Sequence, residues 1–253
     1  MRRFFINQPA GPGAVVVIEN PDANHIVNVL RMQPGDEIWL FDGADHEFRA
    51  HVSGISDGTV TVEVTESFSC LNDSPVRITV GQSLLKNKKT DTVLRQLTEL
   101  GIDGWIPLQT ERSVIKIDRQ NEPSKTDRWQ TIVKESVKQC QRGRIPKIYP
   151  AAEFSEALVL RRRHDLNILF SDGAGDALHL IRERVRHTAP VSILLLLGPE
   201  GGFSPREIEL ARENEFFCAG LGPRILKADT AAVAACAIVQ ALFGDMGKKD
   251  SPR

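Results

Sequence analysis

The stretch "LLLLGPEGGFSPREIE", residues 194–209, joins a run of leucines to two adjacent glycines and a helix start. The leucines predict a buried strand, and Ser204, Pro205 and Glu207 predict a capping box with proline at the first helical position. Strand–glycine–helix segments often bind phosphate, because helix-start N–H groups and the helix dipole attract anions. Here the capping box occupies those groups, and Glu200 and Glu207 would repel phosphate. The loop therefore favours a ligand with an aromatic or apolar body, bound by backbone groups.

Around this stretch, predicted strands and helices alternate from Pro75 onward, which is typical of a parallel sheet covered by helices. The sequence predicts strands at 76–85, from 104, at 166–172 and at 191–198. It predicts helices ending at Gly101, at about 126–142, 176–187 and 205–215, and from about 230 to Phe243, ended by Gly244.

The first seventy residues have a different pattern of predicted elements, mostly short strands, which indicates a small barrel. Short strands rich in β-branched residues are expected at 14–19, 36–42, 47–55 and 59–67. One helix interrupts them; Asp22 is expected to cap it, and Ile26, Val29 and Leu30 share its apolar face.

Two more segments follow strands at the same edge of the predicted sheet, where open α/β folds bind ligands. In "LFSDGAGDAL" (169–178), Leu178 stands where a dinucleotide fingerprint needs Gly or Ala, so we favour an ordinary turn with Asp176 as helix cap. A nucleotide-dependent oxidoreductase would rest on this fragment alone. In "AGLGPRILKADTAAVAACAIVQALFG" (219–244), Asp229 or Thr230 is expected to cap a helix that is buried or packed on another subunit.

Composition narrows the class of protein. The 253 residues are 41% hydrophobic, enough for a sizeable core in one or two domains. We expect a soluble cytosolic protein, because no secretory signal or membrane-spanning segment is recognisable. The four cysteines form no CxxC pair and the six histidines have no ligand spacing, so no metal is predicted.

Charge is distributed unevenly along the chain. Residues 1–73 hold 4 Lys/Arg against 11 Asp/Glu, whereas residues 74–150 hold 15 against 8. A basic block of this kind suits a nucleic-acid partner, although a solvated helix face would produce the same count.

The motifs together resemble a known family. "LLGPEGGFSPREIE" followed by "LGPRILKADTAA" is similar to the paired signatures of the RsmE family of 16S ribosomal RNA methyltransferases, in the SPOUT (α/β-knot) superfamily. The resemblance extends through "RRFF", "NHIVNVLRMQPGD", "LFDG", "LTELGIDGWIPLQTERSV" and "KESVKQCQR". It covers nearly the whole chain in order.

The resemblance implies an α/β fold class with two domains and a tail. These are a PUA-like RNA-binding β-barrel (1–73), a SPOUT trefoil-knot methyltransferase domain with a parallel sheet (74–246) and a flexible tail (247–253). It implies S-adenosyl-L-methionine as cofactor and methylation of uridine N3 in small-subunit rRNA, naked or in the 30S subunit. It also implies a homodimer through the knot domain. By position, cofactor contacts fall on Leu197, Gly198, Glu200, Gly202, Leu221, Gly222, Ile225, Leu226, Thr230 and Ala231.

The second loop departs from the family pattern "ILRTETA", since Lys227, Ala228 and Asp229 replace Arg, Thr and Glu. Lysine cannot make the bidentate contact of arginine, which leaves room for a non-catalytic RNA-binding ribosome-assembly factor. Methylation of another RNA by the same fold is a further alternative.

Catalysis requires removal of the uracil N3 proton, so a carboxylate base and a nearby cation are expected. Glu200 and Asp229 are the candidate bases and Arg112 the candidate cation. A helix cap is the competing role for Asp229, a contact that ties the loop to its own backbone for Glu200, and a surface ion pair for Arg112. Phosphate contacts are predicted for Arg2, Arg3, Arg31, Lys86, Lys88, Lys89, Arg142 and Arg144.

Overall fold

The computed structural model describes residues 3–86, 88–116, 122–172, 178–185 and 190–247. These residues form two compact units. The first comprises residues 1–73 and 134–145, and the second comprises 74–133 and 146–253. The domain boundaries proposed from the resemblance stay a prediction. Residues 248–253 of the predicted tail lie outside the described residues.

The first unit is built on a five-stranded sheet in the order β1-β3-β4-β5-β2. Its core contains buried residues from all five strands, for example Phe4, Val16, Ile38, Val52 and Val62. The elements are β1 (Arg3–Phe5), β2 (Val15–Ile18), α1 (Asp22–Asn24), a π-helical turn (His25–Val29), β3 (Glu37–Phe41), β4 (His46–Ser56) and β5 (Thr59–Ser69). The second half of helix α3 (Glu122–Cys140) also belongs to this unit.

The helix predicted after Asp22 is correct in place but wrong in two details. Asp22 is no N-cap: Pro21 holds that position, and the Asp22 carboxylate accepts hydrogen bonds from Lys138 Nζ at 2.9 and 3.0 Å. Val29 is 62% exposed, whereas Ile26 is fully buried. The turn is π-helical, with Leu30 N donating to His25 O at 2.9 Å, so the 3.6-residue spacing assumed from the sequence does not apply.

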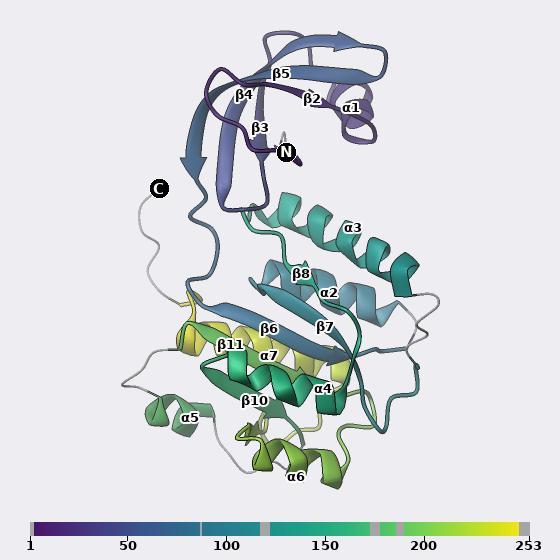
Figure 1. Ribbon diagram of the computed structural model, residues 1–253, viewed down its shortest axis with the longest axis vertical. Helices are drawn as coiled ribbons and strands as arrows, with labels where there is room; N and C mark the ends of the chain where they lie inside the picture. Colours follow the sequence, from purple (N-terminus) through teal and green to yellow (C-terminus); the bar gives the residue numbers. More distant parts are fainter. Residues whose placement is uncertain (1–2, 87, 117–121, 173–177, 186–189, 248–253) are drawn as a thin grey trace. The chain divides into compact units, whose positions relative to one another are not determined.

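The second unit is a seven-stranded parallel sheet in the order β12-β10-β11-β6-β7-β8, with β9 beside β7 (Figure 1). Parallel sheets are covered on both faces and their strands are accordingly apolar. The strands are β6 (Arg77–Ser83), β7 (Gly104–Gln109), β8 (Lys147–Ile148), β9 (Ala152–Glu153), β10 (Leu166–Phe170), β11 (Ser192–Leu197) and β12 (Phe217–Ala219). The leucine run of β11 is buried from Ile193 to Leu197, as predicted.

Helices cover both faces of this sheet. One face packs on α4 (Phe154–Val159) and α6 (Pro205–Glu213), through Leu169, Leu194 and Leu196 (Figure 1). α7 (Ala228–Phe243) contacts β11 and lies beside α2 (Lys89–Glu99) and α5 (Leu178–Arg184). The short 3-10 turn Leu160–Arg163 follows α4. These observations confirm the predicted α/β class with a parallel sheet.

Helix ends test the sequence-based predictions one by one. The capping box is confirmed, since Glu207 N donates to Ser204 Oγ at 3.2 Å and Ser204 N to Glu207 Oε2 at 2.8 Å. Gly244 ends α7 as predicted. The cap predicted for α7 is wrong: Lys227 is the N-cap, and the helix already includes Asp229 and Thr230. Among the described helices, none is long and apolar enough to cross a membrane.

Candidate functional site

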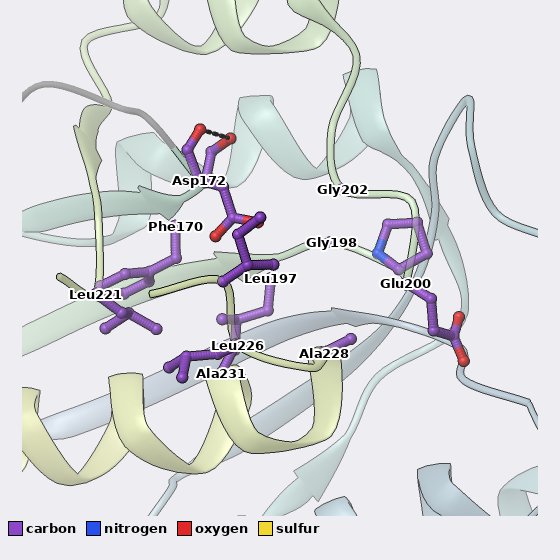
Figure 2. Close-up of a pocket in the computed structure, with 13 residues that line it drawn as sticks. Phe170, Asp172, Leu197, Gly198, Glu200, Gly202, Leu221, Leu226, Ala228 and Ala231 are labelled. Carbon is purple, nitrogen blue, oxygen red and sulfur yellow. Dashed lines mark hydrogen bonds between the residues drawn. The ribbon is translucent and has the colours of Figure 1, made fainter. Parts of the chain in front are cut away.

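A pocket of about 90 Å³ lies where three loops leave the carboxyl ends of neighbouring parallel strands. The loops follow β10, β11 and β12, and the start of α7 completes the wall (Figure 2). This is the edge of the sheet at which open α/β folds bind ligands. The lining residues are Phe170, Ser171, Asp172, Leu197, Gly198, Pro199, Glu200, Gly202, Leu221, Ile225, Leu226, Ala228 and Ala231.

Eight of the ten positions that the resemblance indicates for the cofactor line this pocket. Gly222 lies outside the lining, next to Leu221, and is exposed. Thr230 lines a different groove, between α2 and α7. The structure therefore brings together residues that lie up to 34 positions apart, from Leu197 to Ala231.

Sequence reasoning missed the contribution of the loop after β10. Phe170, Ser171 and Asp172 line the pocket although the fragment 169–178 was interpreted as an ordinary turn. Ser171 N donates to Ala219 O at 3.0 Å, which fixes this strand end beside β12. The sequence did contain one indication: this segment directly follows a predicted strand, at the edge of the sheet where open α/β folds bind ligands. The Gly173–Gly175 fragment and the cap predicted at Asp176 lie outside the described residues.

The glycine loop after β11 needs glycine for a steric reason. A Cβ atom at Gly198 would lie 3.2 and 3.3 Å from the backbone C and Cα of Gly202, closer than ordinary contact. Gly202 itself has a φ of +65°, in the left-handed region. Below the loop, the fully buried Gln82 donates from Nε2 to Gly198 O at 3.2 Å. The "GPEGG" sequence is thus a tight turn whose backbone faces the pocket.

Both candidate catalytic residues near this loop have contacts to backbone. Glu200 Oε1 accepts a hydrogen bond from Lys86 N at 3.1 Å, and Arg112 Nη1 donates to Gly201 O at 3.1 Å. Glu200 and Arg112 are exposed. One of the five N–H donors of the Arg112 guanidinium is used in this contact, and among the described residues no other partner is seen for the remaining donors. Glu200 is therefore tied to backbone, but to that of the segment before α2 and not to its own loop.

Asp229 lines the groove between α2 and α7 and forms an ion pair with Lys89, with Nζ–Oδ2 at 3.0 Å. The hydrogen bond from Lys89 lowers the pKa of the Asp229 carboxyl below its ordinary value, and the Thr230 N–H contributes in the same direction. A carboxylate with a lowered pKa is a weaker base. The pair also links the start of α2 to the start of α7.

The predicted RNA-contact residues differ in their exposure. Arg3 is 5% exposed; it pairs with Glu47 at 2.7 Å and donates to Val137 O and Arg142 O. Arg142 is 4% exposed and pairs with Asp73 at 2.7 Å. Buried, paired guanidinium groups do not reach an external phosphate.

The other predicted RNA-contact residues lie nearer the surface. Arg144 pairs with Asp45 at 2.6 Å and is half-buried, whereas Arg31, Lys86 and Lys88 are exposed. Arg2 lies outside the described residues.

Each of the two units contains a match to a known protein family. A family described as "RNA methyltransferase domain" matches residues 72–240. A second, described as "RNA methyltransferase PUA domain", matches residues 18–65.

Several similar proteins match almost the whole chain. A ribosomal RNA small subunit methyltransferase E of Synechocystis is 31% identical, with 91% of this chain and 74% of the relative covered. The protein of the same name from Bacillus subtilis is 29% identical, with 94% and 96% covered. The crystal structure of the Neisseria gonorrhoeae protein of that name, bound to S-adenosyl methionine, superposes with a TM-score of 0.86. It is 29% identical, with 97% of this chain and 99% of that chain covered.

Proposed function

Since the chain belongs to the RNA methyltransferase family, among the ribosomal RNA small subunit methyltransferases E, we propose that it methylates uridine N3 in 16S rRNA. The proposed cofactor is S-adenosyl-L-methionine. The fold class is that of the SPOUT methyltransferases, with a PUA-like first unit. The observation that carries the proposal is the pocket at the carboxyl ends of β10, β11 and β12, lined by eight of the positions that the family motifs indicate.

The chemistry of the pocket fits this cofactor. Leu197, Leu221, Leu226 and Ala231 supply apolar surface for an adenine ring. A side chain at Gly198 would be excluded by the backbone of Gly202, so the loop presents backbone groups to the ligand. The charged lining residues are carboxylates, Asp172 and Glu200, which suit a cationic ligand and disfavour a phosphate. When bound, S-adenosylmethionine supplies a methyl group on a positively charged sulfur.

The residues of this chain would orient the uracil and accept its N3 proton. Arg112 is held beside the glycine loop by Gly201 O and keeps further donors for a uracil carbonyl oxygen. Glu200 and Asp229 remain the candidate bases. Their contacts to Lys86 N and Lys89 favour a positioning role, because each carboxylate is already engaged.

Two substitutions at Glu200 distinguish a role as general base from a role in holding the loop through the hydrogen bond from Lys86 N. Glu200→Gln keeps an oxygen that can accept from Lys86 N–H but cannot accept the uracil proton; Glu200→Ala removes both. For the role in holding the loop, we expect Glu200→Gln to retain kcat within about twofold, and Glu200→Ala to raise KM for the cofactor about fivefold. A kcat loss of about a hundredfold or more in Glu200→Gln would identify Glu200 as the base.

We propose that each unit contacts RNA separately through exposed cations, the first through Arg31 and the second through Lys86 and Lys88. Lys89 and Arg144 would contribute after exchanging their acidic partners for phosphate. Arg3 and Arg142 support the first unit from inside and do not take part in these contacts. Binding should therefore weaken steeply with salt.

A homodimer through the second unit is part of the proposal. The groove between α2 and α7 has an apolar floor of Val233, Ala234 and Ala237. Its rim carries Lys88, Gln96 and Thr230, so a second copy could seat a helix there. We also propose a cytoplasmic location, because a small-subunit rRNA substrate would be encountered there.

Nucleoside mass spectrometry tests the proposed function. Purified protein is incubated with S-adenosylmethionine and either naked 16S rRNA or 30S subunits that lack the modification. We expect 3-methyluridine in one or both substrates, and the ratio between them identifies the preferred one. Cofactor binding without 3-methyluridine in either substrate would overturn the proposed reaction, and methylation of a different RNA would reassign the substrate.

A further inference from the structure

Asp172 differs from the other acidic residue of the pocket in its contacts. Glu200 is bonded to Lys86 N, and Figure 2 shows its carboxylate at one end, turned away from Leu221 and Leu226. Asp172 follows β10 directly, and its carboxylate points toward Leu197 into the space that the loops enclose (Figure 2). Within the described part of the chain, the Asp172 carboxylate has no hydrogen bond or ion pair. Asp172 is also exposed, so its negative charge is accessible to a ligand in the pocket.

The backbone on the N-terminal side of this carboxylate is fixed. Ser171 N donates to Ala219 O at 3.0 Å, which extends the pairing of β10 with β12. Among the described residues, the lining around it contains no cationic side chain, since its other members are apolar residues, glycines, Ser171 and Glu200. The field at Asp172 is thus uncompensated by the pocket itself, and a cationic ligand would supply the missing charge.

We propose that Asp172 recognises the positive charge of the cofactor sulfonium and thereby distinguishes S-adenosylmethionine from the demethylated product. This inference rests on the proposed function. Methyl transfer breaks the bond between sulfur and the methyl carbon, and its electron pair remains on sulfur, which becomes a neutral thioether. The methyl carbon bonds to N3 of uracil, whose proton leaves to a base. The attraction to Asp172 then ends, so the spent cofactor is held less tightly than the fresh one.

Calorimetric titration with S-adenosylmethionine and S-adenosylhomocysteine tests this, since the two ligands differ by one methyl group and one charge. We expect Asp172→Asn to weaken binding of S-adenosylmethionine about fivefold, as for a partly exposed charge pair, and to change binding of S-adenosylhomocysteine less than about twofold. Asp172→Glu keeps the charge and should keep the preference. Glu213→Gln removes an exposed carboxylate from α6, outside the pocket, and should leave both affinities unchanged.

Each result bears on a different claim. Equal weakening of both ligands by Asp172→Asn would assign the carboxylate to the ribose or to the loop structure and overturn the inference. Unchanged affinities would also overturn it. If the wild-type protein binds neither ligand, the proposed function fails. If Asp172→Asn weakens binding of S-adenosylmethionine but not of S-adenosylhomocysteine, the result supports both the proposed function and this inference. The preference of the wild-type protein should also fall as salt is raised, since partly exposed charges are screened.

Discussion

The two loops that lie across the pocket from one another are built in opposite ways. The first, residues 198–207, is tied on several sides, by Gln82 at Gly198 O, Arg112 at Gly201 O and Lys86 at Glu200. The second, residues 221–228, is exposed from Gly222 to Ile225, and the Ile225 side chain is 86% exposed although it lines the pocket. The first loop therefore sets the shape of the site, and the second supplies apolar surface that a ligand can bury.

This contrast has a thermodynamic consequence. Changes in the first loop should alter folding stability and ligand affinity together, because its contacts exist before the ligand binds. Changes at the tip of the second loop should alter affinity alone, because few contacts are lost from the free protein.

The largest effect is expected at Glu207, the buried end of the first loop. Its carboxylate accepts from Ser204 N at 2.8 Å and from Glu111 N at 2.9 Å. Glu207→Gln places an amide NH₂ against one of these donors and leaves a buried polar group unsatisfied, so we expect a loss of about 2–3 kcal/mol in the free energy of unfolding. Urea denaturation measures it. The control Glu209→Gln, on an exposed part of α6, should change stability by less than about 0.5 kcal/mol; a similar loss there would contradict the assignment.

The next effect compares one glycine from each loop. A Cβ at Gly198 would meet the Gly202 backbone at 3.2 Å, whereas a Cβ at Gly222 has no atom within 4 Å. Gly198→Ala should therefore weaken S-adenosylmethionine binding about tenfold or more. Gly222→Ala carries only the strain of its φ of +97° and should weaken it less, by about threefold. Calorimetry measures both, and equal losses would remove the distinction between the loops.

Ile225 tests the second loop directly. Because its side chain is exposed in the free protein, Ile225→Ala should leave the free energy of unfolding unchanged within about 0.5 kcal/mol. Partial burial of the side chain by the ligand should make affinity fall about fivefold on truncation. A stability loss of 2 kcal/mol or more, or an unchanged affinity, would show that the loop is packed differently from the account given above.

The smallest effect concerns the Lys89–Asp229 ion pair at the end of the second loop. The pair lowers the pKa of Asp229, so its contribution to stability is present above the ordinary value of 3.8 and is lost as pH falls through the lowered pKa. The contribution should be below about 1 kcal/mol, because both side chains are partly exposed. Carboxyl NMR titration measures the pKa, which should rise toward its ordinary value in Lys89→Ala. An unchanged pKa would exclude the ion pair in solution.

The same local-versus-distant contrast explains what the sequence could predict. The β11 strand and the Ser204–Glu207 capping box were predicted correctly, because each has a sequence pattern that involves only nearby residues. The π-helical turn after Asp22 was not, because it is a departure from the helical spacing on which the prediction relied. The wall contributed by Phe170 to Asp172 depends on β10 lying between β11 and β12, which no local pattern states.

The sequence alone could not show which cationic side chains are accessible to RNA. The sequence counts Arg3 and Arg142 as available cations, yet Glu47 and Asp73, which are 44 and 69 residues away, neutralise them inside the first unit. Only the three-dimensional pairing separates these buried guanidinium groups from the exposed Lys86 and Lys88.

Hydrogen exchange with and without S-adenosylmethionine tests the central claim, that these loops form the cofactor site. We expect added protection in 197–202 and 221–231, with the larger gain in the second loop because it has fewer contacts before binding. Protection confined to the groove lined by Lys116 and Arg206, or to the α2–α7 groove, would contradict it.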